Sequence, residues 1–433
     1  MLLVIRCIKE SNCKLYMIKL FSYLLTLLTF FILSSCGHEK NSATEQSSVL
    51  DQSKVTIGAE VFIEEHLGDF EGMRIGLVMN PTARIGEVHM LDTLLALNVN
   101  VTALFAPEHG FRGEAGAGEK IEDGIDQSSG LPVFSLYGDT RKPTPEMMEN
   151  VDVLIFDMQD VGARFYTYIA TLGYVIEAAA EAEVAVWILD RPNPAGGNYV
   201  NGWILEDQFK SFVGPYPIPI AHGLTLGELA HMMIGEEWIP LENDPELHVV
   251  EMRGWNRDMI WPDTGLNWVP PSPNLPTFEH AFLYLGTVYY EGTTLSEGRG
   301  TPNPFLTLGD PSTQLTDDDM MKLKNLTPSL QLERISFVPE SIPGVAPNPK
   351  HLGSESFGVK INAVNYDFDP IRVGLEMFSI ILNSTSDYQI RSFLYRLAGT
   401  QEIDRLIEGE LSASEIDFEI EEFLEQRQPY LLY

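Results

Sequence analysis

The sequence predicts an α/β protein, with a parallel, doubly wound sheet in the first half of the chain and mixed strands and helices in the second. Short apolar runs rich in β-branched residues alternate with segments of helical spacing. Most of these runs stop at proline, asparagine or aspartate, as strands do where they enter loops. The apolar content of 44% is ordinary for a globular protein, and the length predicts two domains.

The elements of the first half follow one another in the order strand, helix, strand. The expected strands are Arg74–Met79, Val101–Phe105, Pro132–Leu136, Val151–Phe156 and Val184–Leu189. The expected helices are Met90–Leu97 and the alanine-rich Tyr168–Ala182. Because ligands bind at the carboxyl ends of parallel strands, the loops after these strands are the first place to look for a site.

The second half begins after a connection rich in proline and glycine. Thr225 with Glu228 three residues later forms a capping box for a helix to about Ile234. The chain is irregular and proline-rich from Leu266 to Pro276, and we place the boundary between domains 54–265 and 266–433 there. The elements expected beyond it are strands Arg334–Val338 and Gly358–Ala363 and helices Ile371–Ile381, Glu402–Ile407 and Glu415–Gln426.

The N-terminus has the features of a targeting segment. Lys19 precedes an apolar run, Leu20–Leu33, and Leu33-Ser34-Ser35-Cys36 follows it. This order is typical of a secretory signal, here residues 1–35, and the cysteine resembles a bacterial lipobox. We expect a lipid on Cys36, a flexible tether over 36–53 and a periplasmic or outer-membrane-associated lipoprotein of the cell envelope. The alternative is a plain cleaved signal with an incidental cysteine.

Charge and cysteine content exclude several classes of partner. The net charge of −34 repels nucleic acid and anionic lipid, so we expect no nucleic-acid partner and membrane contact only through the lipid anchor. An anionic substrate is still allowed, since one arginine can dominate inside a cleft. Cys7 and Cys13 precede the expected cleavage, which leaves Cys36 alone and excludes an internal disulfide or a cysteine metal site.

The loop after the expected strand Val101–Phe105 contains several side chains that are suited to catalysis. Glu108, His109 and Arg112 follow Pro107 and are punctuated by Gly110 and Gly113. A glutamate beside a histidine suits general acid catalysis or nucleophilic attack. The alternative is a solvated loop, but prolines and glycines fix a backbone and thereby aim a side chain.

Polar side chains also follow two further expected strands. These are Asp157, Asp160, Arg164 and Tyr166 after the fourth expected strand, and Asp190, Arg191 and Asn193 after the fifth. Charged groups beside aromatic rings suit a sugar, whose hydroxyls bond polar atoms while its faces stack on rings. The structural alternative for one of Asp157 and Asp160 is that the helix macrodipole favours an aspartate near a helix N-terminus. The alternative for Arg191 is an ion pair with Asp157 or Asp190.

A second polar loop follows the aromatic run Ala281–Tyr290. Glu291, Glu297 and Arg299 are separated by small residues, which indicates close backbone packing around a ligand. The alternative is a structural Glu297–Arg299 ion pair in a turn, which would still leave Glu291 free. No G-x-S-x-G, H-E-x-x-H or intact phosphate loop occurs, and the nine histidines show no ligand spacing. We therefore expect no metal and no cofactor.

Several long blocks, in order along the chain, resemble one glycoside hydrolase family, the NamZ-type exo-β-N-acetylmuramidases, long known only as a domain of unknown function. The blocks are Phe105–Gly113, Phe156–Tyr168, Leu189–Pro194, Trp268–Pro276, which contains Asn274, and Ser296–Thr301. The resemblance runs from about Val55 to the C-terminal RQPYLLY. It implies a Rossmann-like N-terminal domain, a smaller α+β C-terminal domain and an active site in the cleft between them.

The resemblance also implies a reaction, the release of terminal N-acetylmuramic acid from the non-reducing end of peptidoglycan fragments during cell-wall turnover. The substrates would be muramyl saccharides or muropeptides. The proposed catalytic glutamate of the family falls on Glu108. Glycoside hydrolysis commonly uses two carboxyl groups, and Glu291, Asp160 and Glu297 compete for the second role. Attack by the acetamido oxygen of the substrate is a third route.

Muramic acid carries a lactyl carboxylate, which a planar guanidinium can bind with two hydrogen bonds. Arg164, Arg191 and Arg299 are candidates for that contact, and His109 can orient Glu108 or bond a hydroxyl. Two rival functions stay open at this point. One is a glycan-binding surface lipoprotein without catalysis, and the other is a nucleotide-dependent sugar enzyme, against which the missing glycine fingerprint argues.

Overall fold

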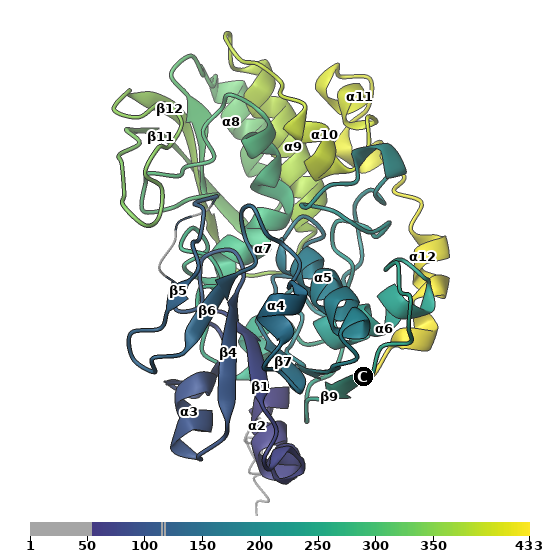
Figure 1. The fold of residues 1–433 in the computed structure, drawn as a ribbon. Coiled ribbons are helices and arrows are strands. Elements are labelled where there is room, and N and C mark those ends of the chain that lie inside the picture. Colours follow the sequence, from purple (N-terminus) through teal and green to yellow (C-terminus); the bar gives the residue numbers. More distant parts are fainter. Residues whose placement is uncertain (1–53, 114–115, 117) are drawn as a thin grey trace, which may run out of the picture. The chain divides into compact units, whose positions relative to one another are not determined.

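A seven-stranded sheet with covered faces forms the centre of the N-terminal half (Figure 1). The computed structural model describes residues 54–113, 116 and 118–433, so the predicted signal, tether and lipidated Cys36 lie outside the described residues. The strand order is β5-β6-β4-β1-β7-β8-β9, and every neighbouring pair is parallel except β5 with β6. The strands are β1 (Ile75–Met79), β4 (Val101–Ala106), β5 (Gly124–Ile125), β6 (Pro132–Ser135), β7 (Val153–Asp157), β8 (Ala185–Leu189) and β9 (Leu247–Val250).

Alternate side chains of each strand enter different cores, as the two-residue period of a strand requires. On β1, Val78 belongs to one buried cluster, whereas Leu77 and Met79 belong to another. The first cluster includes residues of α5 and α6, and the second includes residues of α2 and α3. Burial of both faces explains why these strands are nearly all apolar. The helices of this half are α2 (Gly58–Val61), α3 (Met90–Ala96), α4 (Pro145–Met148), α5 (Tyr168–Glu181) and α6 (Leu226–Gly235).

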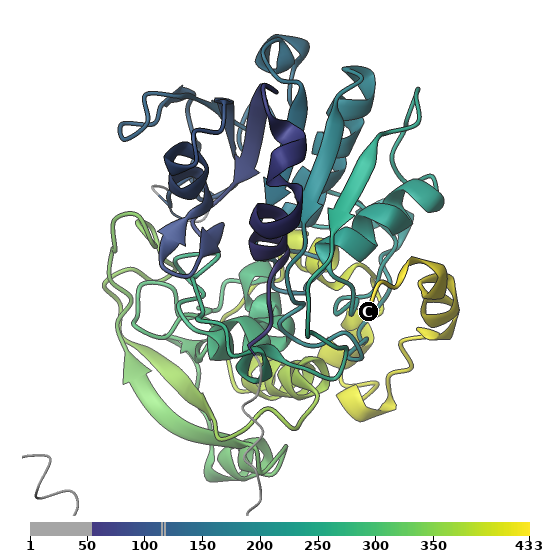
Figure 2. The ribbon, with the colours of Figure 1, turned by 90° about the horizontal axis from the view of Figure 1, so that it is seen from below.

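The second half contains a three-stranded antiparallel sheet and most of the remaining helices (Figure 2). Its sheet has the order β10-β12-β11, with β10 (Thr307–Asp310), β11 (Leu330–Phe337) and β12 (Ser356–Ala363). Its helices are α7 (Phe278–Thr287), α8 (Asp317–Lys324), α9 (Pro370–Asn383), α10 (Phe393–Ala398), α11 (Ile403–Ile407) and α12 (Glu421–Gln426). A two-stranded ribbon of β2 (Arg84–Ile85) and β3 (Val88–His89) completes the strands.

The five strands expected in the first half are confirmed as β1, β4, β6, β7 and β8, each within two residues of its predicted ends. The capping box is also confirmed, because Thr225 Oγ1 accepts from Glu228 N and Glu228 accepts from Thr225 N at the start of α6. Several elements were not predicted, among them the strands β9 and β10, which have four residues each, and the helix α7. The helix expected over Glu415–Gln426 begins only at Glu421, after a 3-10 turn.

One buried cluster runs from the large sheet into the second half. It joins Val78 and Leu154 to Leu375 and Phe378 of α9. The division into two domains near residue 265 stays a prediction. No helix among the described residues is long and apolar enough to cross a membrane.

Candidate active site

A pocket of about 570 Å³ receives side chains from both halves of the chain. Its size falls in the range usual for small-molecule sites. Acidic lining residues are Glu108, Glu119, Glu291 and Glu297, and basic ones are Arg299, Lys350 and Arg391. Aromatic lining residues are Tyr137, Phe165, Tyr166, Phe212, Tyr284, Phe305 and Phe393. Of the residues predicted from sequence, the pocket brings together Glu108, His109, Tyr166, Glu291, Glu297 and Arg299.

Glu108 is placed by a tight turn directly after β4. Gly110 N donates to Pro107 O at 3.0 Å, and His109 within this turn has φ +73°, a left-handed conformation that few non-glycine residues adopt. Such a backbone persists only where its surroundings hold it. Both oxygens of the Glu108 carboxylate accept hydrogen bonds, Oε1 from Gly118 N at 3.1 Å and Oε2 from Thr167 Oγ1 at 2.8 Å. The carboxylate is therefore held in one orientation at the pocket wall.

Thr167 and Tyr137 support Glu108, and neither was among the residues predicted for the site. Thr167 stands at the N-cap of α5, where its side chain makes no capping bond and its hydroxyl donates to Glu108. Tyr137 follows β6, and burial together with the charge of Glu108 raises the pKa of its hydroxyl. Tyr137 could have been found, since it also lies just beyond the carboxyl end of a predicted strand.

Replacing Thr167 by valine should lower kcat/KM about 10- to 100-fold, because the variant loses a hydrogen bond to a charged group while keeping its shape. Steady-state kinetics on a chromogenic muramide measures the effect. Thr167→Ser restores the hydroxyl and should restore most of the activity. A serine variant as impaired as the valine variant, at unchanged thermal stability, would argue against this positioning role.

The glutamates of the second loop are locked in a network with two cations. Arg299 pairs with Glu291 and lies 3.7 Å from Glu297, while Lys350 Nζ lies 2.8 Å from Glu297 Oε2. Lys350 also donates to Tyr290 O and Leu295 O, at 2.7 and 2.9 Å. The Glu297–Arg299 pair named as the structural alternative is thus present, and it extends to Glu291.

Glycine is required at two positions in this loop. Gly298 and Gly300 have φ of +82° and +80°. A Cβ on Gly298 would lie 2.5 Å from Thr307 O, and one on Gly300 would lie 2.5 Å from Glu340 O. The small residues of the Ser296–Thr301 block therefore allow close backbone approach.

Burial and charge act differently on the two glutamates. Burial raises the pKa of Glu291, and this effect outweighs the opposing charge of Arg299. Burial also disfavours the charged form of Glu297, but the charges of Lys350 and Arg299 prevail and lower its pKa. Glu297 is thus held as an anion within the network, while Glu291 is the glutamate whose proton affinity the site increases.

The other predicted residues lie outside this pocket. Asp157 is enclosed in an ion pair with Arg191, one of the alternatives named above. Asp160 and Asn193 are buried beside a cavity of about 10 Å³, with Asn193 donating to Leu224 O. Arg112 pairs with Asp92 and Asp126.

Arg164 and Asn274 bind backbone next to the pocket. Arg164 has no exposed surface, and its guanidinium donates to carbonyl oxygens of Trp203, Ile218 and Leu397. Asn274 Nδ2 donates to Val345 O, and the pocket is lined by Val345 but not by Asn274. Both residues support the wall from behind.

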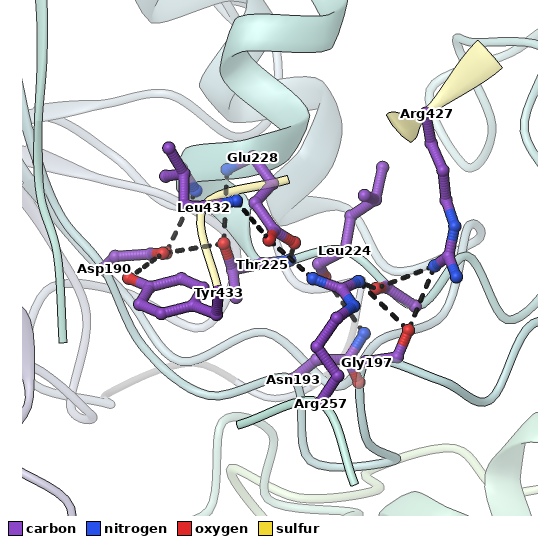
Figure 3. Close-up of polar contacts among 12 residues, drawn as sticks. Asp190, Asn193, Gly197, Leu224, Thr225, Glu228, Arg257, Arg427, Leu432 and Tyr433 are labelled. Atoms are coloured by element: carbon purple, nitrogen blue, oxygen red, sulfur yellow. Dashed lines mark hydrogen bonds and ion pairs between the residues drawn. The ribbon is translucent and has the colours of Figure 1, made fainter. Parts of the chain in front are cut away.

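Asp190 anchors the C-terminus (Figure 3). Its carboxylate accepts from Thr225 Oγ1, Gly227 N and Tyr433 Oη at 2.7 to 3.0 Å. Leu432 N donates to Glu228 Oε1 nearby, at 2.9 Å. The last two residues of the chain therefore cover the carboxyl end of β8, and we assign Asp190 a structural role in preference to substrate binding.

The buried Asp160 should make stability depend on pH. Burial raises its pKa to about 7, and its Oδ2 has no hydrogen-bond partner among the described residues. A raised carboxyl pKa contributes stability fully below the unfolded value near 4, and this contribution is lost as pH rises through 7. The free energy of unfolding should fall by about 2 to 3 kcal/mol between pH 5 and 8 from this group alone. Urea unfolding of wild type and Asp160→Asn at both pH values measures it, and equal pH dependence in both proteins would contradict it.

Comparisons with known proteins match this chain to one family over most of its length. Residues 75–279 match the family model "Exo-beta-N-acetylmuramidase NamZ, N-terminal" and residues 282–433 match its C-terminal counterpart. The peptidoglycan beta-N-acetylmuramidase NamZ of Bacillus subtilis (strain 168) is 39% identical over an alignment of 424 residues, and the match covers 96% of this chain and 99% of that protein.

Two crystal structures of DUF1343 family proteins from Bacteroides fragilis NCTC 9343 have the same fold. They superpose with TM-scores of 0.72 and 0.75 at 37% and 32% identity. Each comparison covers 88% of this chain and 99% of the other. The sequence blocks, the fold and these relatives agree, and the chain belongs to the NamZ exo-β-N-acetylmuramidase family.

Proposed function

We propose that this protein is a glycosidase that releases terminal N-acetylmuramic acid from the non-reducing end of peptidoglycan fragments. The observation that carries the proposal is Glu108, a carboxylate fixed at both oxygens in the same pocket as Glu291. The similar protein of B. subtilis is named a peptidoglycan beta-N-acetylmuramidase. Nothing in these comparisons favours the alternative of a glycan-binding protein without catalysis.

The shape and chemistry of the pocket suit one sugar residue. Aromatic rings such as Tyr166 and Tyr284 offer faces for the apolar side of a pyranose, and the carboxylates offer acceptors for its hydroxyls. The parallel strands have, in chain order, the arrangement 3-2-1-4-5-6 that is usual in Rossmann folds. We therefore infer a Rossmann-like N-terminal domain, with the active site in a cleft between it and the C-terminal domain.

Glu108 and Glu291 are the pair we propose for catalysis. Of the three candidates for the second carboxyl group, Asp160 lies outside the pocket and Glu297 is held as an anion by Lys350 and Arg299. Glu291 remains, and its raised pKa suits a group that exchanges a proton during turnover. One of the pair would protonate the glycosidic oxygen, and the other would activate water or attack the anomeric carbon.

Turnover tests this proposal directly. The full chain is incubated with a muramyl-terminated tetrasaccharide, and the products are identified by mass spectrometry. We expect N-acetylmuramic acid and a trisaccharide shortened from the non-reducing end. Folded protein that binds the saccharide without releasing any product would identify the non-catalytic alternative. A rise in thermal stability on addition of a nucleotide would instead support the alternative of a nucleotide-dependent sugar enzyme.

We further propose that the protein is a lipoprotein of the cell envelope, held by a lipid on Cys36. The support is the sequence order of basic residue, apolar run and Leu-Ser-Ser-Cys. A Cys36→Ala variant should lose the lipid and leave the membrane fraction. A lipid-free wild-type protein in the soluble fraction would indicate a plain cleaved signal.

A further inference from the structure

Among the residues that the structure describes, the pocket contains one arginine or lysine whose charge is not already neutralised by a protein carboxylate. Three cations line it in the described part of the chain, Arg299, Lys350 and Arg391. Arg299 is paired with Glu291 and Glu297, and Lys350 is paired with Glu297 and bonded to two carbonyl oxygens. These four side chains balance one another, with two positive and two negative charges.

Arg391 differs from the other two cations. Its side chain is exposed, and among residues 54–113, 116 and 118–433 it has neither an ion pair nor a side-chain hydrogen bond. A guanidinium offers five donors in a planar fork, which matches the geometry of a carboxylate. An unpaired guanidinium at a pocket wall is therefore available to an anionic group of a ligand.

The backbone of Arg391 is fixed beside Glu291. Arg391 N donates to Gly292 O at 2.9 Å, and Ile390 forms a β-bridge with Thr293. Phe393, two residues further on, also lines the pocket. The backbone that carries the guanidinium is thus fixed next to one of the two proposed catalytic carboxylates. The main entropic cost of binding a ligand is therefore the ordering of the Arg391 side chain.

We propose that Arg391 binds the lactyl carboxylate of N-acetylmuramic acid and thereby selects muramyl over glucosaminyl substrates. This inference rests on the proposed function. The arginines named from sequence are engaged elsewhere, with Arg164 on carbonyl oxygens, Arg191 on Asp157 and Arg299 on two glutamates. In a protein with a net charge of −34, an anionic substituent needs such a cation to enter a pocket lined by four glutamates.

The test compares two chromogenic substrates, an N-acetylmuramide and its lactyl methyl ester, which differ in one charge. Wild-type kcat/KM should be about 10- to 100-fold higher for the acid, mainly through KM. Arg391→Gln should lose this preference and cleave both substrates about as well as the wild type cleaves the ester. The matched control is Arg396→Gln, an exposed arginine on α10 that does not line the pocket. Arg141→Gln is a second comparison, because Arg141 lies 4.3 Å from the ring of pocket residue Phe212.

Equal losses on both substrates in Arg391→Gln would overturn the inference, as would a selective loss in Arg141→Gln with Arg391→Gln unaffected. Binding of free N-acetylmuramic acid and N-acetylglucosamine, measured by calorimetry, separates the inference from the proposed function. Selective weakening of muramate binding in Arg391→Gln supports the inference even if no substrate is turned over. Unchanged muramate binding would overturn it even if the enzyme is active.

Discussion

Replacing Glu108 by glutamine should lower kcat on a muramyl disaccharide by at least about 100-fold, with the fold intact. The substitution keeps the size of the side chain but removes its ability to hold or transfer a proton, a contribution of about 10²- to 10⁴-fold in enzymes. The amide oxygen can still accept from Gly118 N, and the amide nitrogen can donate to the Thr167 hydroxyl, which accepts as well as donates, so the turn after β4 should survive. Steady-state kinetics with a thermal melt measures both parts of the expectation.

The same variant assigns the chemical role of Glu108. A nitrophenyl leaving group needs little protonation, so loss of a general acid should harm the nitrophenyl muramide far less than the disaccharide. Loss of a base or nucleophile should harm both substrates alike. Glu122→Gln, which changes an exposed carboxylate paired with Lys120, serves as the control. Glu108→Gln activity within a few-fold of wild type on the disaccharide would remove Glu108 from the chemistry.

The sequence predicts the sheet well because its strands are buried on both faces. Continuous apolar runs such as Val153–Phe156 stand out against the alternating pattern of exposed strands. β9 was missed because its four residues include His248 and follow a polar segment, so no continuous apolar run marks it. Helix α6 was predicted from local chemistry, since its capping box lies within four consecutive residues.

The site was predicted only in part, because the position of a residue at a strand end does not say which neighbour it meets. The expectation that ligands bind at the carboxyl ends of strands led to Glu108 after β4, which lines the pocket. It led equally to Asp157 at the end of β7 and Asp190 after β8, which do not line it. Those two carboxylates instead hold Arg191 and Tyr433, partners 34 and 243 residues away in the chain. Lys350 lies in a loop of the second half, and no local pattern connects it to Glu297.

Replacing Arg164 by methionine should lower the free energy of unfolding by about 3 to 5 kcal/mol. The guanidinium has no exposed surface and donates to Trp203 O, Ile218 O and Leu397 O at 2.5 to 3.1 Å. Methionine fills much of the volume but supplies no donor, so all three oxygens lose the guanidinium, and Ile218 O alone keeps a backbone donor, Leu205 N, among the bonds of the described residues. Each unsatisfied buried group costs about 1 to 3 kcal/mol. Chemical denaturation of the variant and the wild type measures the difference.

The effect should reach the active site, because Leu397 lies at the end of α10 and also lines the pocket. Arg164→Lys keeps the charge but replaces a planar fork by a single ammonium, which cannot serve all three carbonyl oxygens with the same geometry. We expect it to be intermediate in stability and to raise KM more than it lowers kcat. The solvent-exposed Arg405→Met, at 48% side-chain exposure, should leave the unfolding midpoint unchanged. A wild-type midpoint in Arg164→Met would mean that water replaces the guanidinium, and the link between this arginine and the pocket wall would then be abandoned.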